Sequence, residues 1–302
     1  MSLTQFATRI RNSLSKGSEH GLVPFQVMGT TIPKVVHQTY HSKILPNEIQ
    51  QNLNLLKTMN PEWEFKLYDD ADIEHYISSF YPDLLGTFHK INPKYGAAKA
   101  DFFRYLLMYR EGGVYLDIKS SLSRPLREII NPDDKYILTH WTQYSPEFKL
   151  GYLKGITNPY GELHQWHIIA VKGHPFLKHV IENVCRNIDN YNPIIHGCGK
   201  MAVLKVTGPI AYTETITPLL DKYPNQLVLS HEDIGLIYSF MKSYDGHHKF
   251  FEQVHYTKLE EPIIEQSALM MCLFNISKPA ITMVKSLYRF CKYLNEKASK
   301  LH

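Results

Sequence analysis

The sequence predicts an α/β fold with a mostly parallel sheet flanked by helices, and two patterns lead to this class. First, strand-like and helix-like segments alternate from residue 32 onward. Second, a long apolar helix at 97–110 is followed at once by a buried strand at 113–118. The chain has 302 residues, of which 44% are hydrophobic and 21% charged, so it has the size and composition of an ordinary globular protein.

The first half of the sheet is predicted from four consecutive segments. A proline lies near the start of the β-rich run Ile32–Gln38, where strands tolerate one. Apolar residues recur at helical spacing over 47–59, and the Asn-Pro dipeptide after this range ends the helix. The run 63–68 alternates as a strand does, and Asp69 is expected to cap the helix that follows it.

The strongest pattern in the chain is a helix followed directly by a strand. Ala97–Arg110 is rich in alanine and apolar nearly all round, which predicts a buried helix. Gly112 and Gly113 follow where helices favour a glycine cap, and Gly113–Ile118 is predicted to be a buried strand. Further strands are predicted at Tyr136–His140, His167–Val171 and Gln226–Leu229, and further helices at Pro175–Asn190, Pro209–Tyr223 and Thr282–Lys300.

The predicted organisation is an N-terminal arm at 1–30, one α/β domain at 31–260 and a C-terminal helical extension at 261–302. The longest apolar run, Ala268–Phe274, is far shorter than the roughly 18 residues that a membrane-spanning helix needs. The N-terminal segment lacks the apolar core of a signal peptide. We therefore expect a soluble protein in the cytoplasm.

The net charge of +4 is concentrated in the tail. Residues 278–302 contain six basic residues and one acidic residue, which leaves a charge of −1 for the rest of the chain. This balance argues against a nucleic-acid-binding surface on the body, so no nucleic-acid partner is expected. In the tail helix Thr282–Lys300, apolar residues lie together on one face. Lys285, Arg289 and Lys292 lie on the flanks of that face. This helix either docks on the body or lies as a peripheral contact on an anionic membrane that carries a lipid-linked acceptor.

Cysteine and histidine spacings do not indicate a metal site. The four cysteines, at positions 185, 198, 272 and 291, form no CxxC pair, so neither a zinc ribbon nor a disulfide scaffold is expected. Neither His164 with His167 nor His247 with His248 has the helical spacing of a metal-binding pair, and we expect surface or core side chains at these positions.

Three charged residues stand out in the apolar helix and the strand after it. Asp101 and Arg104 are three positions apart and share one helix face. Charges on a buried helix are costly unless they meet each other or a ligand. Asp117 ends the strand at its carboxyl edge, where open α/β sheets bind their ligands. The residue types alone leave two alternatives: an internal ion pair with a loop-capping carboxylate, or a ligand site.

Several motifs resemble one protein family. The run A-x-x-x-D-x-x-R-Y at 97–105, followed by G-G-x-Y-x-D at 112–117, resembles the signature of glycosyltransferase family 32, the sugar-binding region that contains the DXD motif. Further motifs follow the family's order: I-P-K-V-V-H-Q-T at 32–39, N-P-E-W-E at 60–64, Q-W-H-I-I-A at 165–170 and T-G-P at 207–209. The segment at 165–170 is similar to the subgroup with bacterial capsule and giant-virus members.

This resemblance implies a GT-A fold, a single Rossmann-like domain over 31–260, and a hexosyltransferase. Such an enzyme moves a sugar from a UDP- or GDP-sugar to a carbohydrate or other hydroxyl acceptor, with retention of configuration, and takes part in polysaccharide biosynthesis. Asp117 would bind ribose or sugar hydroxyls, Asp101 and Arg104 would orient the sugar, and the first strand would border the base. The implied catalytic residues are Asp101, Arg104, Asp117 and Lys119, and the implied donor-binding residues are His37, Gln38, Thr39, Asp101, Arg104, Tyr115 and Asp117.

The sequence departs from the family pattern at Lys119. The family has a second carboxylate there, which holds a divalent metal, usually Mn²⁺ or Mg²⁺, and here an ammonium takes its place. One interpretation keeps the metal, held by Asp117 and a downstream ligand such as His255. In a second interpretation Lys119 itself neutralises the diphosphate, and in a third it points into solvent.

A rival function from another class is non-catalytic binding of carbohydrates or nucleotide sugars. In that case the lysine at position 119 is a sign that the metal site has been lost. Convergence of Asp101, Arg104 and Asp117 on one pocket favours the enzyme, because a decayed site has no reason to keep all three. Hydrolysis of a donor without any acceptor separates the two functions.

Overall fold

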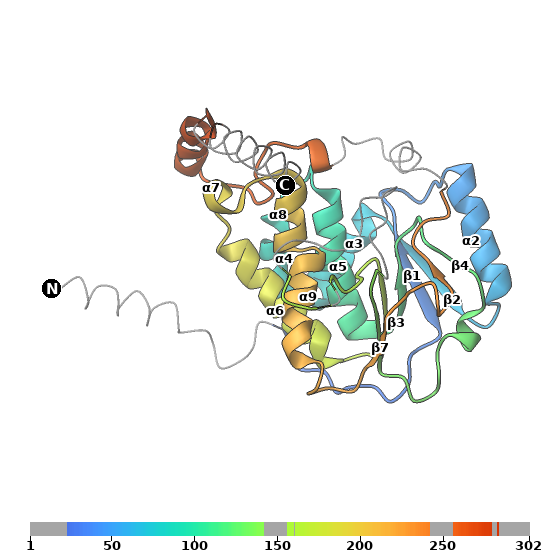
Figure 1. Ribbon diagram of the computed structural model, residues 1–302. Helices are drawn as coiled ribbons and strands as arrows, with labels where there is room; N and C mark the ends of the chain where they lie inside the picture. Colours follow the sequence, from blue (N-terminus) through green and yellow to red (C-terminus); the bar gives the residue numbers. More distant parts are fainter. Residues whose placement is uncertain (1–22, 142–155, 160, 242–255, 280–282, 284–302) are drawn as a thin grey trace, which may run out of the picture.

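The computed structural model describes residues 23–141, 156–159, 161–241, 256–279 and 283. Within these residues a six-stranded sheet has the order β2-β1-β3-β6-β5-β7 (Figure 1). The strands are β1 Val35–Thr39, β2 Glu64–Tyr68, β3 Gly113–Leu116, β5 Tyr136–Thr139, β6 His167–Ala170 and β7 Gln226–Val228. Strand β6 is antiparallel to β3 and β5, and the other pairings in this sheet are parallel. The predicted α/β class and mostly parallel sheet are confirmed, whereas the reversal of β6 was not predicted.

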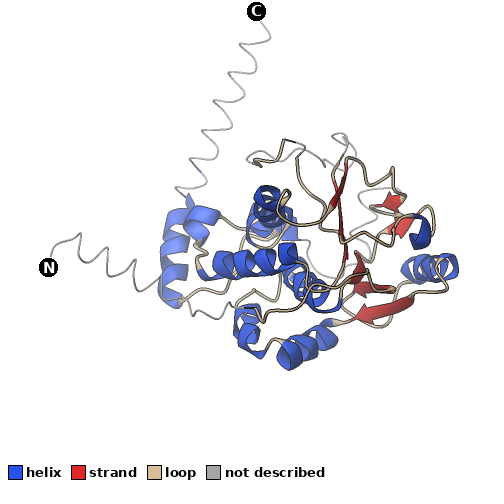
Figure 2. Ribbon diagram, turned by 90° about the horizontal axis from the view of Figure 1, so that it is seen from below, coloured by secondary structure: helices blue, strands red, loops and turns tan. Residues whose placement is uncertain are grey.

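Helices cover the two faces of the sheet unequally (Figures 1 and 2). Helix α2, Asn47–Met59, lies on one face, and most of the other helices lie on the opposite face. The side chains of β3 divide accordingly, because Val114 packs in a cluster with Leu56 of α2 and Tyr115 packs in the larger helical cluster. The helices on the larger side include α3 Asp70–Phe80, α4 Pro82–His89, α5 Gly96–Glu111, α6 Pro175–Asp189, α8 Gly199–Val206 and α9 Pro209–Ile216.

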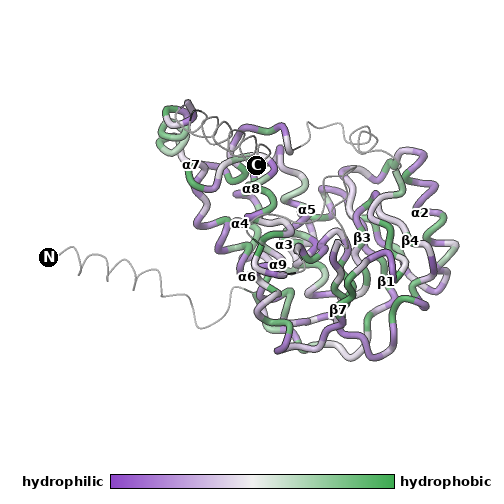
Figure 3. The backbone as a smooth tube through the Cα atoms, in the orientation of Figure 1, coloured by the Kyte–Doolittle hydropathy of each residue, from purple (hydrophilic) through white to green (hydrophobic). Residues whose placement is uncertain are grey.

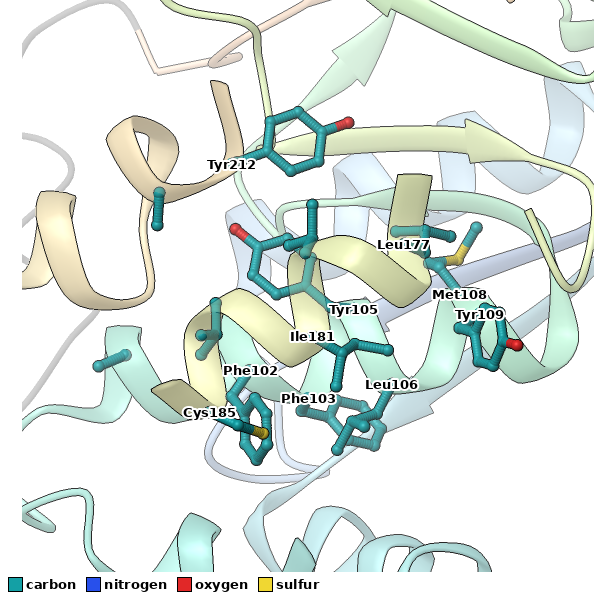
Figure 4. Packing of buried hydrophobic residues seen from close by; sticks show 14 of the residues in the cluster. Phe102, Phe103, Tyr105, Leu106, Met108, Tyr109, Leu177, Ile181, Cys185 and Tyr212 are labelled. Atoms are coloured by element: carbon teal, nitrogen blue, oxygen red, sulfur yellow. The ribbon is translucent and has the colours of Figure 1, made fainter. Parts of the chain in front are cut away.

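Helix α5 lies in the middle of the larger core. Its residues from Asp101 to Tyr109 are all buried, as its nearly uniform apolar character predicts. Tyr105 stacks on Tyr212 of α9 with ring centroids 5.8 Å apart, and Ile181 of α6 packs in the same cluster (Figure 4). Helix α6 alternates between hydrophobic and hydrophilic residues (Figure 3), because only one of its faces enters this core. A polar side chain on the middle of α5 therefore needs a partner inside the protein.

Two glycines join α5 to β3. Gly112 has a φ of 68° and Gly113 a φ of 97°. A Cβ on Gly112 would lie 2.5 Å from the backbone nitrogen of Lys172, and one on Gly113 would lie 2.6 Å from the carbonyl oxygen of Val35. Both positions therefore require glycine for conformation and for space, and the pair lets β3 enter between β1 and β6 directly after the helix.

Most predicted elements are confirmed within one or two residues, and one helix is shorter than predicted. The helix predicted over 209–223 ends at Ile216 and continues as the 3₁₀ turn Thr217–Leu219. Pro218 explains the change, because proline has no N–H to continue the α-helical bonds. The sequence analysis missed α4, α8, the short helix α7 Pro193–His196, the 3₁₀ turns Leu126–Glu128 and Tyr256–Lys258, and a small antiparallel sheet of β4 Ser121–Leu122 and β8 Leu236–Ile237.

Residues on both sides of the predicted domain boundaries pack against the body. Gln26 donates hydrogen bonds to the Tyr109 hydroxyl and to the Arg110 carbonyl, while Ile263 and Ile264 are buried in the core. The boundaries at 30 and 260 stay a prediction. The tail helix predicted at Thr282–Lys300 lies outside the described residues, apart from Met283.

The thiols at Cys185, Cys198 and Cys272 are free, and Cys291 lies outside the described residues. Within the described residues, no helix combines the length and the apolar character that crossing a bilayer requires.

Candidate active site

Helix α5 and strand β3 place three charged residues together at the carboxyl edge of the sheet. Nη2 of Arg104 lies 3.2 Å from Oδ1 of Asp101, and Nη1 lies 3.1 Å from Oδ1 of Asp117. Nη1 also donates to the carbonyl of Gln165 at 2.8 Å, and the guanidinium lies over the ring of Tyr115. We call Asp101, Arg104, Asp117 and Gln165 the arginine cluster. Arg104 therefore contacts both carboxylates, and the three charged residues lie together.

Asp101 is the buried end of the arginine cluster. Its side chain is 5% exposed, and its Oδ1 accepts a hydrogen bond from Nε2 of Gln165 at 3.0 Å as well as pairing with Arg104. Its Oδ2 accepts a hydrogen bond from the hydroxyl of Thr207, also at 3.0 Å. Burial raises the pKa of Asp101, and Arg104, Gln165 and Thr207 oppose this rise by stabilising the carboxylate. Because both oxygens are occupied, this geometry assigns Asp101 to holding Arg104 in place.

Asp117 is the accessible end of the arginine cluster. Its side chain is 22% exposed, against 6% for Arg104. Its backbone N–H donates to the carbonyl of Trp166 at 2.8 Å, which fixes the chain where β3 ends. A carboxylate that is held by a guanidinium yet reachable from solvent can accept hydrogen bonds from ligand hydroxyls.

Lys119 lies two residues beyond Asp117 and is half-buried. Its Nζ donates to the hydroxyl of Tyr238 at 2.7 Å and lies 4.2 Å from the centroid of that ring. Burial works to lower the pKa of Lys119, but Tyr238 and Asp117 outweigh it and the pKa is raised, so the ammonium stays charged. These contacts contradict the interpretation in which Lys119 points into solvent.

The described residues do not fit a divalent metal at this edge. Asp117 has a guanidinium on one side and an ammonium two residues away, and both would repel a cation. Among the residues that the structure describes, no three His, Cys, Asp or Glu side chains are grouped to hold a metal ion. His255, the predicted second ligand, lies outside the described residues, so its role stays a prediction.

The residues predicted to border the base lie mostly inside the protein. His37 is 1% exposed, and its ring nitrogens lie 3.1 Å from the Tyr68 hydroxyl and 3.1 Å from the Gly112 carbonyl. Burial lowers the pKa of His37 to about 4, so the ring is neutral and holds β1 to the α5–β3 junction. Gln38 is also buried. Thr39 is half-buried, and its hydroxyl lies 2.8 Å from that of Tyr115, which places it on the site side of β1.

A second group of buried polar side chains lies at the same edge of the sheet. We call it the imidazole cluster; its members are His140, His164, His167 and His231. The hydroxyl of Thr139 lies 2.8 Å from Nδ1 of His164 and 2.7 Å from Nε2 of His167. Burial lowers the pKa of His167 to about 3 and that of His164 well below its ordinary value. The expectation of core histidines is confirmed for His164 and His167.

The imidazole cluster reaches Lys119, which lies beside the arginine cluster, through aromatic rings. The ring centroid of Trp141 lies 4.3 Å from that of His164 and 5.0 Å from that of Tyr238. Tyr238 in turn accepts the hydrogen bond from Lys119. Sequence reasoning missed the roles of Gln165, Thr207 and Tyr238. Gln165 and Thr207 lie inside the Q-W-H-I-I-A and T-G-P motifs, which was the available signal, whereas nothing in the sequence singled out Tyr238.

Residues 46–150 match the model of the family described as the glycosyltransferase sugar-binding region containing the DXD motif. The chain is 27% identical over 222 residues to inositol phosphoceramide mannosyltransferase 3 of Schizosaccharomyces pombe. This match covers 73% of this chain and 54% of that protein. It is 31% identical over 99 residues to mannosyl phosphorylinositol ceramide synthase SUR1 of Saccharomyces cerevisiae, covering 33% of this chain and 25% of that protein. It is also 25% identical over 228 residues to an initiation-specific alpha-1,6-mannosyltransferase of Candida albicans, covering 66% and 55%.

Two solved structures are similar to this chain at low sequence identity. The PaToxG glycosyltransferase has a TM-score of 0.42 and 15% identity, and covers 72% of this chain and 76% of that one. The UDP-bound glycosyltransferase domain of the YGT toxin has a TM-score of 0.47 and 9% identity, covering 71% and 83%. The chain spans about half the length of the first two curated relatives, 54% and 49%. The sequence matches confirm the resemblance to DXD-motif glycosyltransferases that the motifs predicted.

Proposed function

We propose, from the premise that residues 46–150 are a glycosyltransferase sugar-binding region, that this chain transfers a sugar from a nucleotide-sugar donor to a hydroxyl acceptor. One observation carries the proposal: the accessible carboxylate of Asp117 is ion-paired to the buried Arg104 at the carboxyl edge of β3. This edge is where open α/β sheets bind nucleotides, and both residues lie within the matched region.

Each charged group has a distinct role in this proposal. Asp117 accepts hydrogen bonds from hydroxyls of the ribose or the sugar, and Arg104 holds its carboxylate in one orientation. The ammonium of Lys119 faces the leaving diphosphate. It donates one N–H to the hydroxyl of Tyr238, and its two other N–H groups can donate to phosphate oxygens. Stabilising the negative charge that develops on the diphosphate lowers the barrier to breaking the glycosidic bond. No protein nucleophile is needed, in keeping with transfer that retains configuration.

Metal ions have no step in this proposal. The DXD family pattern has a metal-binding carboxylate at the position of Lys119, and the described residues around Asp117 supply no alternative ligand set. We therefore assign the neutralisation of the diphosphate to Lys119. A contribution from His255 stays a prediction, because that residue lies outside the described part of the chain.

The names of the relatives direct the choice of donor and acceptor. Several relatives are named as mannosyltransferases. Two of the names also contain a ceramide: inositol phosphoceramide in one and mannosyl phosphorylinositol ceramide in the other. A mannosyl donor and a glycoconjugate acceptor are therefore the first pair to test, with UDP-hexoses and polysaccharide acceptors as alternatives. Contact of the basic tail with a membrane and a cytoplasmic location stay predictions.

The test is hydrolysis of a panel of UDP- and GDP-sugars without acceptor, measured as free nucleotide. Asp117→Asn should reduce hydrolysis by at least about 100-fold, or roughly 2.7 kcal/mol of transition-state stabilisation. Asp133→Asn, which changes an exposed aspartate just before β5, at the opposite edge of the sheet from Asp117, serves as the matched control and should leave hydrolysis unchanged.

Two outcomes would contradict the proposal. Binding of nucleotide sugars by wild-type protein without hydrolysis or transfer would favour the non-catalytic alternative. Near-wild-type hydrolysis by Asp117→Asn would remove Asp117 from the site.

A further inference from the structure

Gln165 lies where the reversed strand β6 begins. Because β6 is antiparallel to β3, its first residue His167 pairs with Leu116, the last residue of β3. The segment that enters β6 therefore arrives at the same edge of the sheet as Asp117. In a wholly parallel sheet this edge would receive the segment that leaves the strand. Because β6 is reversed, the residues that precede it, Gln165 among them, lie at the edge of the sheet that carries Asp117.

Gln165 is hydrogen-bonded to three residues within one turn of α5. Its Nε2 donates to Oδ1 of Asp101 at 3.0 Å, and its Oε1 accepts from the hydroxyl of Tyr105 at 3.0 Å. Its backbone carbonyl accepts from Nη1 of Arg104 at 2.8 Å. The next carbonyl, that of Trp166, accepts from the backbone N–H of Asp117. Two consecutive residues therefore fix both partners of the Arg104–Asp117 ion pair.

An amide is the side chain that fits this position. Asp101 presents a carboxylate oxygen and needs a donor, while the Tyr105 hydroxyl shares its one proton between the carbonyl of Thr207 at 2.8 Å and Oε1 of Gln165 at 3.0 Å. A glutamine offers a donor and an acceptor from one planar group. A glutamate in its ionised form offers only acceptors and would place a second negative charge beside Asp101.

We propose that Gln165 is a positioning residue that keeps the guanidinium of Arg104 directed at Asp117. The inference rests on the proposed function, since it concerns the orientation of the group that holds Asp117. Gln165 acts through Asp101. The amide N–H of Gln165 and the hydroxyl of Thr207 both donate to the Asp101 carboxylate and hold it in place. That carboxylate pairs with Nη2 of Arg104, while Nη1 of Arg104 pairs with Asp117.

Donor hydrolysis by three variants tests the proposal, with the nucleotide sugar that wild-type protein hydrolyses fastest. Gln165→Ala should reduce kcat by about 10-fold or more, because one hydrogen bond to a charged group is lost, and should leave KM nearly unchanged. Gln165→Glu should be more active near pH 6 than near pH 8 relative to wild type, because the introduced carboxyl regains a donor only when protonated. Gln50→Glu makes the same change at an exposed glutamine of α2 and should follow the wild-type pH profile.

A second measurement does not depend on catalysis. Nitrogen NMR of the arginine side chains should show separate, slowly rotating Nη signals for Arg104 in the wild type and averaged signals in Gln165→Ala. If wild type hydrolyses no donor but the NMR change occurs, the proposed function fails and the positioning role stands. Unchanged Arg104 signals in Gln165→Ala, or a wild-type pH profile for Gln165→Glu, would overturn the role of Gln165.

Discussion

The arginine cluster and the imidazole cluster lie at the same edge of one sheet and are both largely buried, yet they accommodate polar groups in opposite ways. In the arginine cluster each charge has a partner, and Arg104 stays ionised between Asp101 and Asp117. Burial acts to lower the pKa of Arg104, but Tyr115 and the two carboxylates outweigh it and raise the pKa. The imidazole cluster contains no carboxylate, and burial lowers the pKa of each of its four histidines so that they are neutral.

This difference indicates how each cluster fails. A paired cluster is sensitive to the loss of a partner, because the remaining charge is buried alone. A neutral cluster is sensitive to the gain of a proton, because burial disfavours the charged imidazolium form. The first therefore responds to mutation and the second to acid.

The largest expected effect breaks the paired cluster. Arg104→Leu should lower the free energy of unfolding by about 3–5 kcal/mol, because Asp101 is left as an uncompensated buried carboxylate. Urea denaturation at pH 7 measures it. Arg127→Leu is the matched control, because Arg127 is exposed and lies 3.8 Å from Glu128, and it should change stability little. A loss below about 1 kcal/mol for Arg104→Leu would mean that the ion pairs do not hold the cluster together.

The next effect charges the neutral cluster. The folded-state pKa of His167 is about 3, below its ordinary value of 6.5, so the unfolded chain binds the proton first as the pH falls. The contribution of His167 to stability is therefore complete above pH 6.5 and is lost progressively toward pH 3. His167→Gln should reduce the slope of unfolding free energy against pH by up to about 1.4 kcal/mol per pH unit.

Denaturation at several pH values between 7 and 4 checks the slope. His75→Gln, on the exposed side of α3, should keep the wild-type slope. Identical slopes for His167→Gln and wild type would show that His167 gains its proton equally in both states.

The smallest expected effect lies at the junction of the clusters. Lys119→Ala should weaken donor binding by about 10-fold with or without Mn²⁺, because a charge-assisted hydrogen bond to the diphosphate is lost. Wild-type activity should persist in EDTA, and Lys119→Asp should become dependent on Mn²⁺. Lys57→Ala, at an exposed position of α2, is the control. Wild-type protein silent in EDTA and rescued by Mn²⁺, with Lys119→Ala unaffected, would make Lys119 a bystander.

Local patterns predicted the elements that carry the arginine cluster. The apolar helix, the glycine pair and the strand ending at Asp117 are encoded within about twenty consecutive residues, and the three-residue spacing of Asp101 and Arg104 predicts a shared face. The reversal of β6 and the contacts of Gln165 were not predictable in this way. They depend on which strands pair across the sheet, and Gln165 is 64 positions from Asp101 in the sequence.

The imidazole cluster was beyond sequence reasoning for a similar reason. Its members come from the end of β5, the segment before β6, the start of β6 and the segment after β7. His164 and His167 are three positions apart, but they lie just before and at the start of a strand and not on a helix, and the other spacings match no metal motif. Lys119 shows the opposite case: its identity flagged a departure from the family, but only the position of Tyr238 reveals where its ammonium is held.

The two glycines between α5 and β3 divide the G-G-x-Y-x-D motif into two kinds of constraint. Gly112 and Gly113 are demanded by the crowding of neighbouring backbones at Lys172 and Val35, whatever reaction the protein performs. In the proposed function, Asp117 is demanded by a ligand. If that function is right, a descendant of this chain that stopped transferring sugars would be free to change the aspartate, yet it would still need both glycines to fold. In a genome survey, the glycine half of the motif therefore marks inheritance of the scaffold, and only the aspartate half reports that its chemistry was kept.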